Sequence, residues 1–135
     1  MTSIQDIKDH IKYHQERYTP EGEEPLKPIF EIALFEHPDK EMIYHKNGQD
    51  IPSGFPDAPM DTMGFYYDLE TAIQAMNENR CDIQETVFHA GFIFCKFPGL
   101  YQCATQNARM YFLWDEEKKG FFQAEEPEIF HHIAY

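Results

Sequence analysis

Basic residues are scarce in this chain. Of its 135 residues, 11 are Lys or Arg and 24 are Asp or Glu, which gives a formal net charge of −13 at pH 7. Nucleic acids and anionic membranes are bound through clustered Lys and Arg side chains. The sequence therefore predicts neither direct nucleic-acid binding nor membrane binding. Two interpretations stay open: the acidic charge keeps the protein dispersed, or it meets a basic protein partner.

Cysteine is rare as well. The chain has three, Cys81, Cys95 and Cys103, which is an odd number, and no two of them form a C-x-x-C pair. This argues against a zinc ribbon and against the disulfide framework of a secreted protein. No basic segment followed by an apolar run opens the sequence, and no apolar run approaches the roughly 20 residues of a membrane span. We therefore expect a cytoplasmic protein in which Cys95 and Cys103 are buried, reduced thiols.

Glycine is limited to seven residues, and the motifs that depend on it are missing. The sequence contains no G-x-x-x-x-G-K-[ST] phosphate-binding loop, no G-x-G-x-x-G dinucleotide motif, no G-x-S-x-G nucleophile motif and no EF-hand loop. Phosphoryl transfer and dinucleotide chemistry are therefore not expected, and no cofactor is predicted.

Metal ligands with a recognisable spacing are limited to one pair. His10 and His14 lie four residues apart in a helical pattern, a spacing at which two imidazoles can share a metal ion. Ile11 stands where a zinc protease would carry its catalytic Glu, and no third ligand can be identified. We therefore interpret both histidines as polar residues at the edge of an apolar stripe, and we predict no metal site.

Aromatic residues, by contrast, are plentiful. The chain has 12 Phe, 8 Tyr and one Trp, and 42% of its residues are hydrophobic. This is enough apolar material for a packed core, which excludes wholesale disorder. The length is that of one domain, so residues 1–135 are predicted to fold as a single domain.

The first half of the chain predicts one helix and two strands. Ser3 precedes isoleucines that recur at helical spacing, so residues 4–18 are predicted to form a capped amphipathic helix. Residues 29–36 (IFEIALFE) and the short segment EMIYH are predicted strands. Residues 46–62 hold three prolines and two glycines, and we predict a long irregular loop there.

Residues 64–124 predict a strand, a helix, a strand and a hairpin. Asp68 follows the aromatic strand FYY and is placed to cap a helix that begins with LETAIQAM. The segment ETVFHAGFIFCKF alternates in polarity and is predicted to be a strand, with Phe88, Phe92 and Phe94 on one face. RMYFLWD and GFFQAE are two further strands, which EEKKG connects as a hairpin.

This order of elements, α-β-β-β-α-β-β-β, contains a single strand-helix-strand crossover. A doubly wound parallel sheet is therefore disfavoured. We predict an α+β fold in a single domain, with a mainly antiparallel sheet of about five to six strands and two helices packed on one face.

Glu85, His89, Arg109 and Phe55 are the candidate contacts for a ligand or a partner. A carboxylate and an imidazole can perform general acid–base chemistry. On a strand, however, Glu85 and His89 would lie about 13 Å apart, which is too far for a direct hydrogen bond. Arg109 either holds a carboxylate ligand or pairs with a surface acid. Phe55 either anchors its loop or serves as an exposed contact. No catalytic residue is assigned.

Four blocks of the second half carry a resemblance: GFYYDLETAI, CDIQETVFHAGFIFCKFPGLY, RMYFLWDEEKKGFF and EEPEIFHHIAY. They resemble a group of small acidic proteins from gut Firmicutes and their mobile elements. The resemblance covers residues 64–135 and implies a bacterial origin. It implies no activity and no catalytic residues.

These observations favour a non-enzymatic interaction module, in the form of an inhibitor or accessory factor that presents carboxylates to a basic protein. The alternative is a small ligand-binding domain or enzyme with a pocket near Glu85, His89 and Arg109. Aromatic edges on a small sheet also leave a homodimer open.

Overall fold

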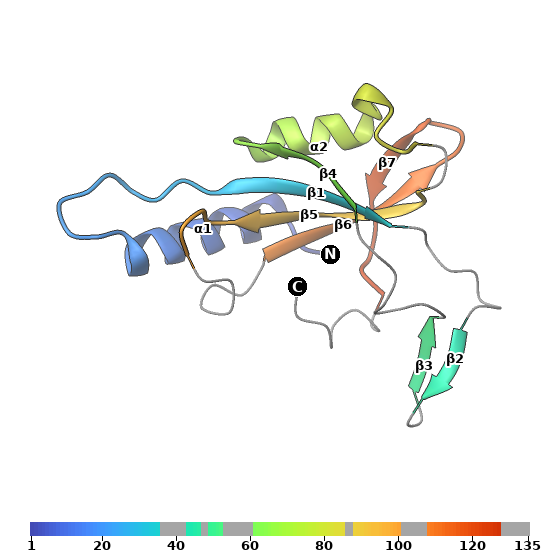
Figure 1. Cartoon of the computed structure of the whole chain (residues 1–135), viewed down its shortest axis with the longest axis horizontal. Coiled ribbons are helices and arrows are strands. Elements are labelled where there is room, and N and C mark those ends of the chain that lie inside the picture. The colour runs from blue at the N-terminus through green and yellow to red at the C-terminus, as the bar shows by residue number, and fades with distance from the viewer. Residues whose placement is uncertain (36–42, 47–48, 53–60, 86–87, 101–107, 128–135) are drawn as a thin grey trace.

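The computed structural model of the chain describes residues 1–35, 43–46, 49–52, 61–85, 88–100 and 108–127 (Figure 1). Within these residues it contains two α-helices and a five-stranded antiparallel sheet. The predicted α+β, single-domain arrangement is confirmed, with a sheet at the lower end of the predicted strand count.

Helix α1 (Ile4–Tyr18) has the bounds that the sequence predicts. The amide of Asp6 donates to the Ser3 hydroxyl at 3.0 Å, and the amide of Ser3 donates to the Asp6 carboxylate at 2.8 Å. This reciprocal capping box satisfies two amides that the first helical turn leaves without partners. The hydrogen bond from the Ser3 backbone also lowers the pKa of Asp6, since it stabilises the charged carboxylate.

The main sheet has the strand order β4-β1-β5-β6-β7, and every neighbouring pair is antiparallel. Strands β6 and β7 form the predicted hairpin, while β1 joins β5 through a full ladder from Ile29 to Phe35. The strands are β1 (Ile29–Phe35), β4 (Asp61–Tyr66), β5 (Ala90–Lys96), β6 (Ala108–Asp115) and β7 (Gly120–Gln123).

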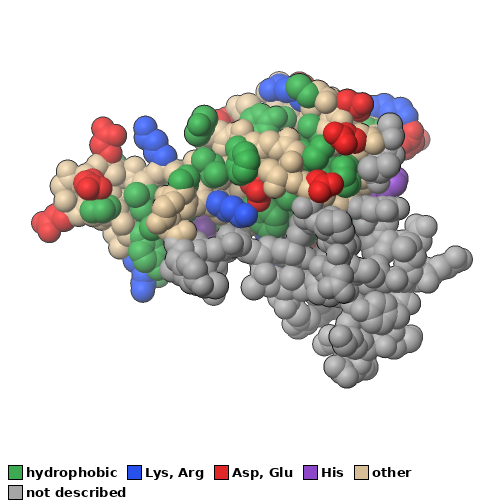
Figure 2. Space-filling model, in the orientation of Figure 1, with side chains coloured by type: hydrophobic (Ala, Val, Ile, Leu, Met, Phe, Trp, Pro, Cys, Tyr) green, Lys and Arg blue, Asp and Glu red, His purple; other side chains and the backbone are tan. Residues whose placement is uncertain are grey.

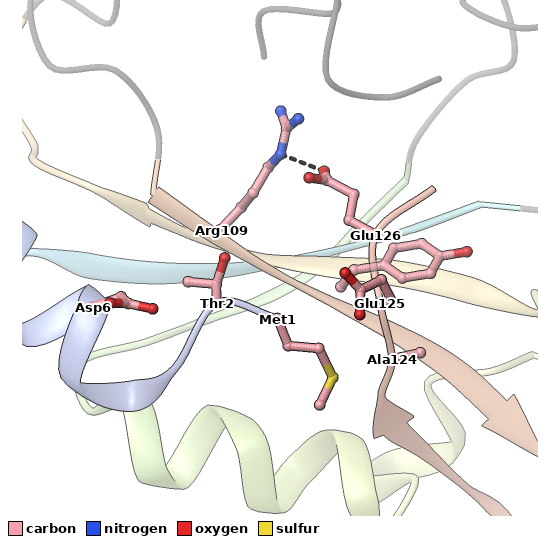
Figure 3. Close-up of a pocket in the computed structure, with 8 residues that line it drawn as sticks. Met1, Thr2, Asp6, Arg109, Ala124, Glu125 and Glu126 are labelled. Carbon is pink, nitrogen blue, oxygen red and sulfur yellow. Dashed lines mark ion pairs between the residues drawn. The ribbon is translucent and has the colours of Figure 1, made fainter. Parts of the chain in front are cut away.

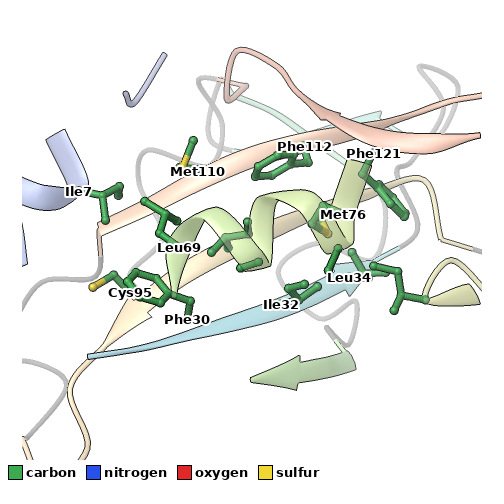
Figure 4. Packing of buried hydrophobic residues seen from close by; sticks show 14 of the residues in the cluster. Ile7, Phe30, Ile32, Leu34, Leu69, Met76, Cys95, Met110, Phe112 and Phe121 are labelled. Atoms are coloured by element: carbon green, nitrogen blue, oxygen red, sulfur yellow. The ribbon is translucent and has the colours of Figure 1, made fainter. Parts of the chain in front are cut away.

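Helix α2 (Leu69–Asn77) lies on the same face of the sheet as α1. Asp68 caps it as predicted, because its carboxylate accepts from the amide of Thr71 at 2.9 Å and from the Thr71 hydroxyl at 2.8 Å. Figure 4 shows the core between helices and sheet, to which α1 contributes Ile7. Buried core residues include Leu69, Ala72 and Met76 from α2 and Phe30, Ile32, Leu34, Ile93, Met110, Phe112 and Phe121 from the sheet.

The second face of the sheet is also apolar and buried. Its cluster consists of Ala33 and Phe35 of β1, Ala90, Phe92 and Phe94 of β5, and Tyr111 of β6. Side chains alternate between the two faces of a strand, so β1 and β5 must supply apolar residues at successive positions. This explains why the sequence of β1 shows no polar face.

The expected loop over residues 46–62 is wrong in part. Strand β3 (Gln49–Pro52) lies inside it and pairs with β2 (Ile43–Lys46) in a separate two-stranded sheet, and β4 begins at Asp61. Proline was the reason for expecting no regular structure. Pro52 is tolerated because it ends a strand of a two-stranded sheet, where a missing N–H breaks no central ladder.

The predicted strand beginning at Glu85 is also too long, since β5 begins at Ala90. Residues Arg80–Asp82 form a 3₁₀ turn, and Asn79, Cys81, Asp82 and Glu85 all have positive φ angles. The amide of Gln84 donates to the Asn79 side chain at 2.9 Å, which supports this turn. As a consequence Phe88 packs in the core beneath the helices. The prediction that it shares a face with Phe92 and Phe94 is wrong.

Candidate functional site

The structure places the predicted contact residues at separate positions. Glu85 is exposed in the turn before β5, and His89 is exposed directly before that strand. Arg109 lies in β6 opposite Phe94, near the other end of β5. Phe55 lies outside the described residues.

The register of β5 with β6 sets the distance between His89 and Arg109. The amide of Trp114 donates to the His89 carbonyl at 2.9 Å, whereas Arg109 pairs with Phe94. Five residues at about 3.3 Å per residue separate these two points by roughly 17 Å. The ladder therefore does not bring Glu85, His89 and Arg109 into one pocket.

Arg109 is held by a neighbouring carboxylate. Its Nε lies 2.6 Å from Oε1 of Glu126, and its guanidinium carbon lies 5.3 Å from the centre of the Phe92 ring. Of the two roles predicted for Arg109, pairing with an acidic residue is the one that the structure shows. Burial, with the nearby charge of Glu126, raises the pKa of Tyr111 well above its ordinary value.

A cavity of about 250 Å³ adjoins this ion pair (Figure 3). Arg109 and three carboxylates line it, from Asp6, Glu125 and Glu126. One guanidinium that is already matched by Glu126 leaves an excess of negative charge around the space. The cavity is therefore unsuited to an anionic ligand such as a phosphate or carboxylate.

His10 and His14 lie against each other on α1. Their ring centres are 4.1 Å apart, and Nδ1 of the buried His14 lies 2.9 Å from the carbonyl oxygen of His10. The rings of Tyr18 and Phe97 stack on His14 at 5.8 and 5.9 Å. Among the described residues no group of three His, Cys, Asp or Glu side chains could hold a metal ion. The pair is packed as part of the helix–sheet contact.

Burial, together with the charge of His14, lowers the pKa of His10 from 6.5 to about 4. Between these values the unfolded chain binds a proton that the folded chain does not, so the free energy of unfolding falls as the pH drops from 6.5 to 4. We expect a loss of about 1–2 kcal/mol over this window, a figure discounted for the solvent that reaches the ring. Urea unfolding at a series of pH values measures it. His10→Asn should flatten the curve in this window, and an unchanged slope would contradict the assignment.

Cys95 offers no reactive thiol. It is buried in the core beneath the helices, and burial raises its pKa to about 12, so the thiolate that redox or nucleophilic chemistry needs is not formed near neutral pH. The predicted burial of Cys95 is confirmed, while Cys103 lies outside the described residues.

Among the described residues, the two most exposed aromatic side chains lie in or directly after the edge strand β4. Phe65 is 59% exposed, and Tyr67, which directly follows the strand, is 90% exposed. Asp61, Asp68 and Glu70 are exposed as well, but Asp61 lies opposite Leu34 on the helix-covered face of the sheet, whereas Phe65 lies opposite Glu31 on the other face. From residue 61 to residue 79 the sequence contains four acidic residues and no Lys or Arg. This edge of the sheet therefore carries exposed aromatic and acidic side chains, with Phe65 and Asp61 on opposite faces, and we call Phe65, Tyr67 and the three carboxylates the β4 edge patch.

Glu31 fixes β4 to the sheet. Its carboxylate accepts from the Thr62 hydroxyl at 2.9 Å and lies 2.9 Å from the Lys96 ammonium group, so one side chain joins β4, β1 and β5. Both side chains of this ion pair are partly buried, so salt weakens it less than a fully exposed pair. The patch is therefore presented by a strand held in a fixed position.

Acidic side chains also lie elsewhere on the surface. Figure 2 shows them over the connection between α1 and β1 at one end of the molecule and again at the opposite end. Glu21, Glu23 and Glu24 are exposed in that connection. The exposed large aromatic side chains among the described residues are Tyr13, Phe65 and Tyr67, and none of them belongs to that connection.

The sequence predicted FYY as an aromatic strand but not the exposure of Phe65 and Tyr67; Tyr66 between them packs against the core. A signal was present: Tyr67 stands between the end of a strand and Asp68, the residue that caps α2. A side chain at such a junction has no regular face to bury. The large tyrosine there could have been predicted to be exposed.

No family model, curated protein or solved structure matches this chain. The resemblance to small acidic proteins of gut Firmicutes and their mobile elements therefore stays a prediction. In the part of the chain that the structure describes, neither helix has the length and apolar character needed to cross a membrane.

Proposed function

We propose that this chain is a non-enzymatic interaction module that binds a basic protein, as an inhibitor or accessory factor. The observation that carries the proposal is the β4 edge patch, in which Phe65 and Tyr67 are exposed on an edge of the sheet that also carries exposed carboxylates. Exposed aromatic side chains supply apolar contact area, and carboxylates at the same edge select a basic partner and speed its association. The net charge of −13 supports the same choice of partner.

The alternative is a ligand-binding domain or enzyme. The Arg109 cavity supports it less than the β4 edge patch supports the interaction module. Glu126 compensates the guanidinium, and Asp6 and Glu125 add further negative charge. Among the described residues this cavity contains neither Glu85 nor His89. A ligand that binds there would raise the unfolding temperature by mass action, so a thermal-shift panel of metabolites tests the alternative directly.

Affinity capture from the native host at low and high salt tests the proposal. We expect one defined basic protein to be retained at low salt and released at high salt, because exposed charges are screened within about 10 Å at 0.1 M salt. The double variant Phe65→Ser/Tyr67→Ser should lose that protein. Tyr13→Ser is the matched control, because Tyr13 is 55% exposed on α1, away from β4. Retention that is insensitive to salt, or no defined partner, would contradict the proposal.

A further inference from the structure

The outer edge of β4 can accept another strand. In the described sheet β4 pairs with β1 on one side and with no other strand. An edge strand presents backbone N–H and C=O groups that an extended peptide can pair with, and its side chains then add specificity. The other edge of the sheet is β7.

The β7 edge is a poor docking site. The hairpin before the strand mixes Glu116 and Glu117 with Lys118 and Lys119. The ammonium group of Lys118 lies 4.7 Å from the centre of the Phe122 ring and so covers the aromatic residue of this edge. Lysines are one means by which proteins block an edge, and β4 carries none.

The chemistry of β4 selects the occupant. We propose that the Gly64–Tyr67 part of this edge binds an extended basic segment of a partner protein, which adds a sixth strand to the sheet. This inference rests on the proposed function and names its docking site. Side chains of the added strand alternate between the two faces of the sheet, so its apolar residues contact Phe65 on one face and its Lys or Arg residues face Asp61 on the other.

The carboxylates of the patch are available for such contacts. Glu70 has Lys8 as its ion-pair partner at 3.6 Å, and both side chains are more than half exposed, so this pair is weak. The Asp68 carboxylate accepts two hydrogen bonds from Thr71, which lower its pKa and keep it charged. An incoming Lys or Arg would meet negative charge without displacing a strong existing pair.

A second copy of the chain is the less suitable occupant. Two β4 edges would place their carboxylates beside one another, in a protein that already carries a charge of −13. Met63 also interrupts the register, because Ile32 pairs with Gly64 and Ala33 with Thr62, leaving Met63 without an opposite residue. The bulge limits a regular docking edge to the residues after it, whichever strand is added, so the like charge of two β4 edges is what disfavours a second copy.

Binding of three labelled peptides to the whole chain tests the inference. The first is an eight-residue peptide alternating Lys with Val and Thr, the second carries N-methyl groups on alternate residues of the same sequence, and the third replaces each Lys by Glu. We expect the first to bind at least tenfold more tightly than the second, because N-methylation removes strand pairing and keeps the charge. The third should not bind. The variant Phe65→Ser/Tyr67→Ser should weaken binding of the first peptide at least tenfold, and Tyr13→Ser should not.

The outcomes distinguish this inference from the proposed function. Equal binding of the first two peptides, or insensitivity to Phe65→Ser/Tyr67→Ser, would overturn strand addition at β4 and leave salt-sensitive recognition of a basic protein intact. Failure of basic peptides and basic proteins alike would overturn both. A concentration-dependent dimer in sedimentation that the double variant abolishes would assign the edge to a second copy, and so also overturn the inference.

Discussion

Gly120→Ala is expected to lower the free energy of unfolding by about 3 kcal/mol or more. A Cβ atom at this position would lie 1.9 Å from the carbonyl oxygen of Asn77 and 2.8 Å from its carbonyl carbon. Both atoms belong to the backbone at the end of α2, so no side-chain rotation relieves the clash. The β6–β7 hairpin must move away from α2, and the core contacts between β7 and α2 are lost.

Gly22→Ala is the control for this prediction. Gly22 has a φ angle of +82° and no neighbouring heavy atom within 4 Å of an added Cβ, so the substitution costs only the backbone strain of about 1–2 kcal/mol. Urea unfolding of both variants measures the difference. Equal losses for the two would show that the approach of β7 to α2 tolerates a side chain, contrary to the expectation.

The sequence predicts Gly120 as the start of a strand but gives no sign of this close approach. The clash involves Asn77, which is 43 residues earlier in the chain and belongs to a different element. The contact between the end of α2 and the β6–β7 hairpin depends on how α2 packs across the sheet. Local sequence patterns carry no information about the distance between Gly120 and the end of α2.

Elements whose signals are local were predicted well. Ser3 and Asp68 were identified as helix caps because the capping hydrogen bond joins residues three positions apart. The β6–β7 hairpin followed from two apolar runs around a charged turn. The start of β5 was not predicted, because the chain between Asn79 and Glu85 adopts positive φ angles at residues other than glycine. Tertiary contacts hold such a turn, and residue preferences alone do not indicate it.

The candidate site was harder to predict than the fold. Arg109 was selected as the only arginine in the last fifty residues, and its partner Glu126 lies 17 positions further along the chain. Sequence distance gives no means of choosing Glu126 among the 24 acidic residues. The β4 edge patch was missed for a related reason: an edge strand is recognised only when the strand order is known, and the order β4-β1-β5 joins strands that are far apart in sequence.

Phe92→Ala is expected to lower the free energy of unfolding by about 3–5 kcal/mol. Phe92 is fully buried in the second face of the sheet, where its ring centre lies 5.8 Å from that of Phe35, 5.2 Å from that of Phe94 and 5.3 Å from that of Tyr111. The Arg109 guanidinium lies over the same ring. Truncation removes apolar burial, leaves a cavity among three aromatic neighbours, and takes away the ring that contacts Arg109.

Phe65→Ala provides the matched comparison, because the same residue type is removed from the same sheet at a position where the side chain is 59% exposed. We expect its free energy of unfolding to change by no more than about 1 kcal/mol, since little apolar surface returns to water. The two variants should also separate in function: Phe65→Ala should unfold like the wild type yet bind the basic peptide more weakly. A loss of stability from Phe65→Ala as large as that from Phe92→Ala would mean that Phe65 is a core residue, and the β4 edge could then no longer be assigned to a partner.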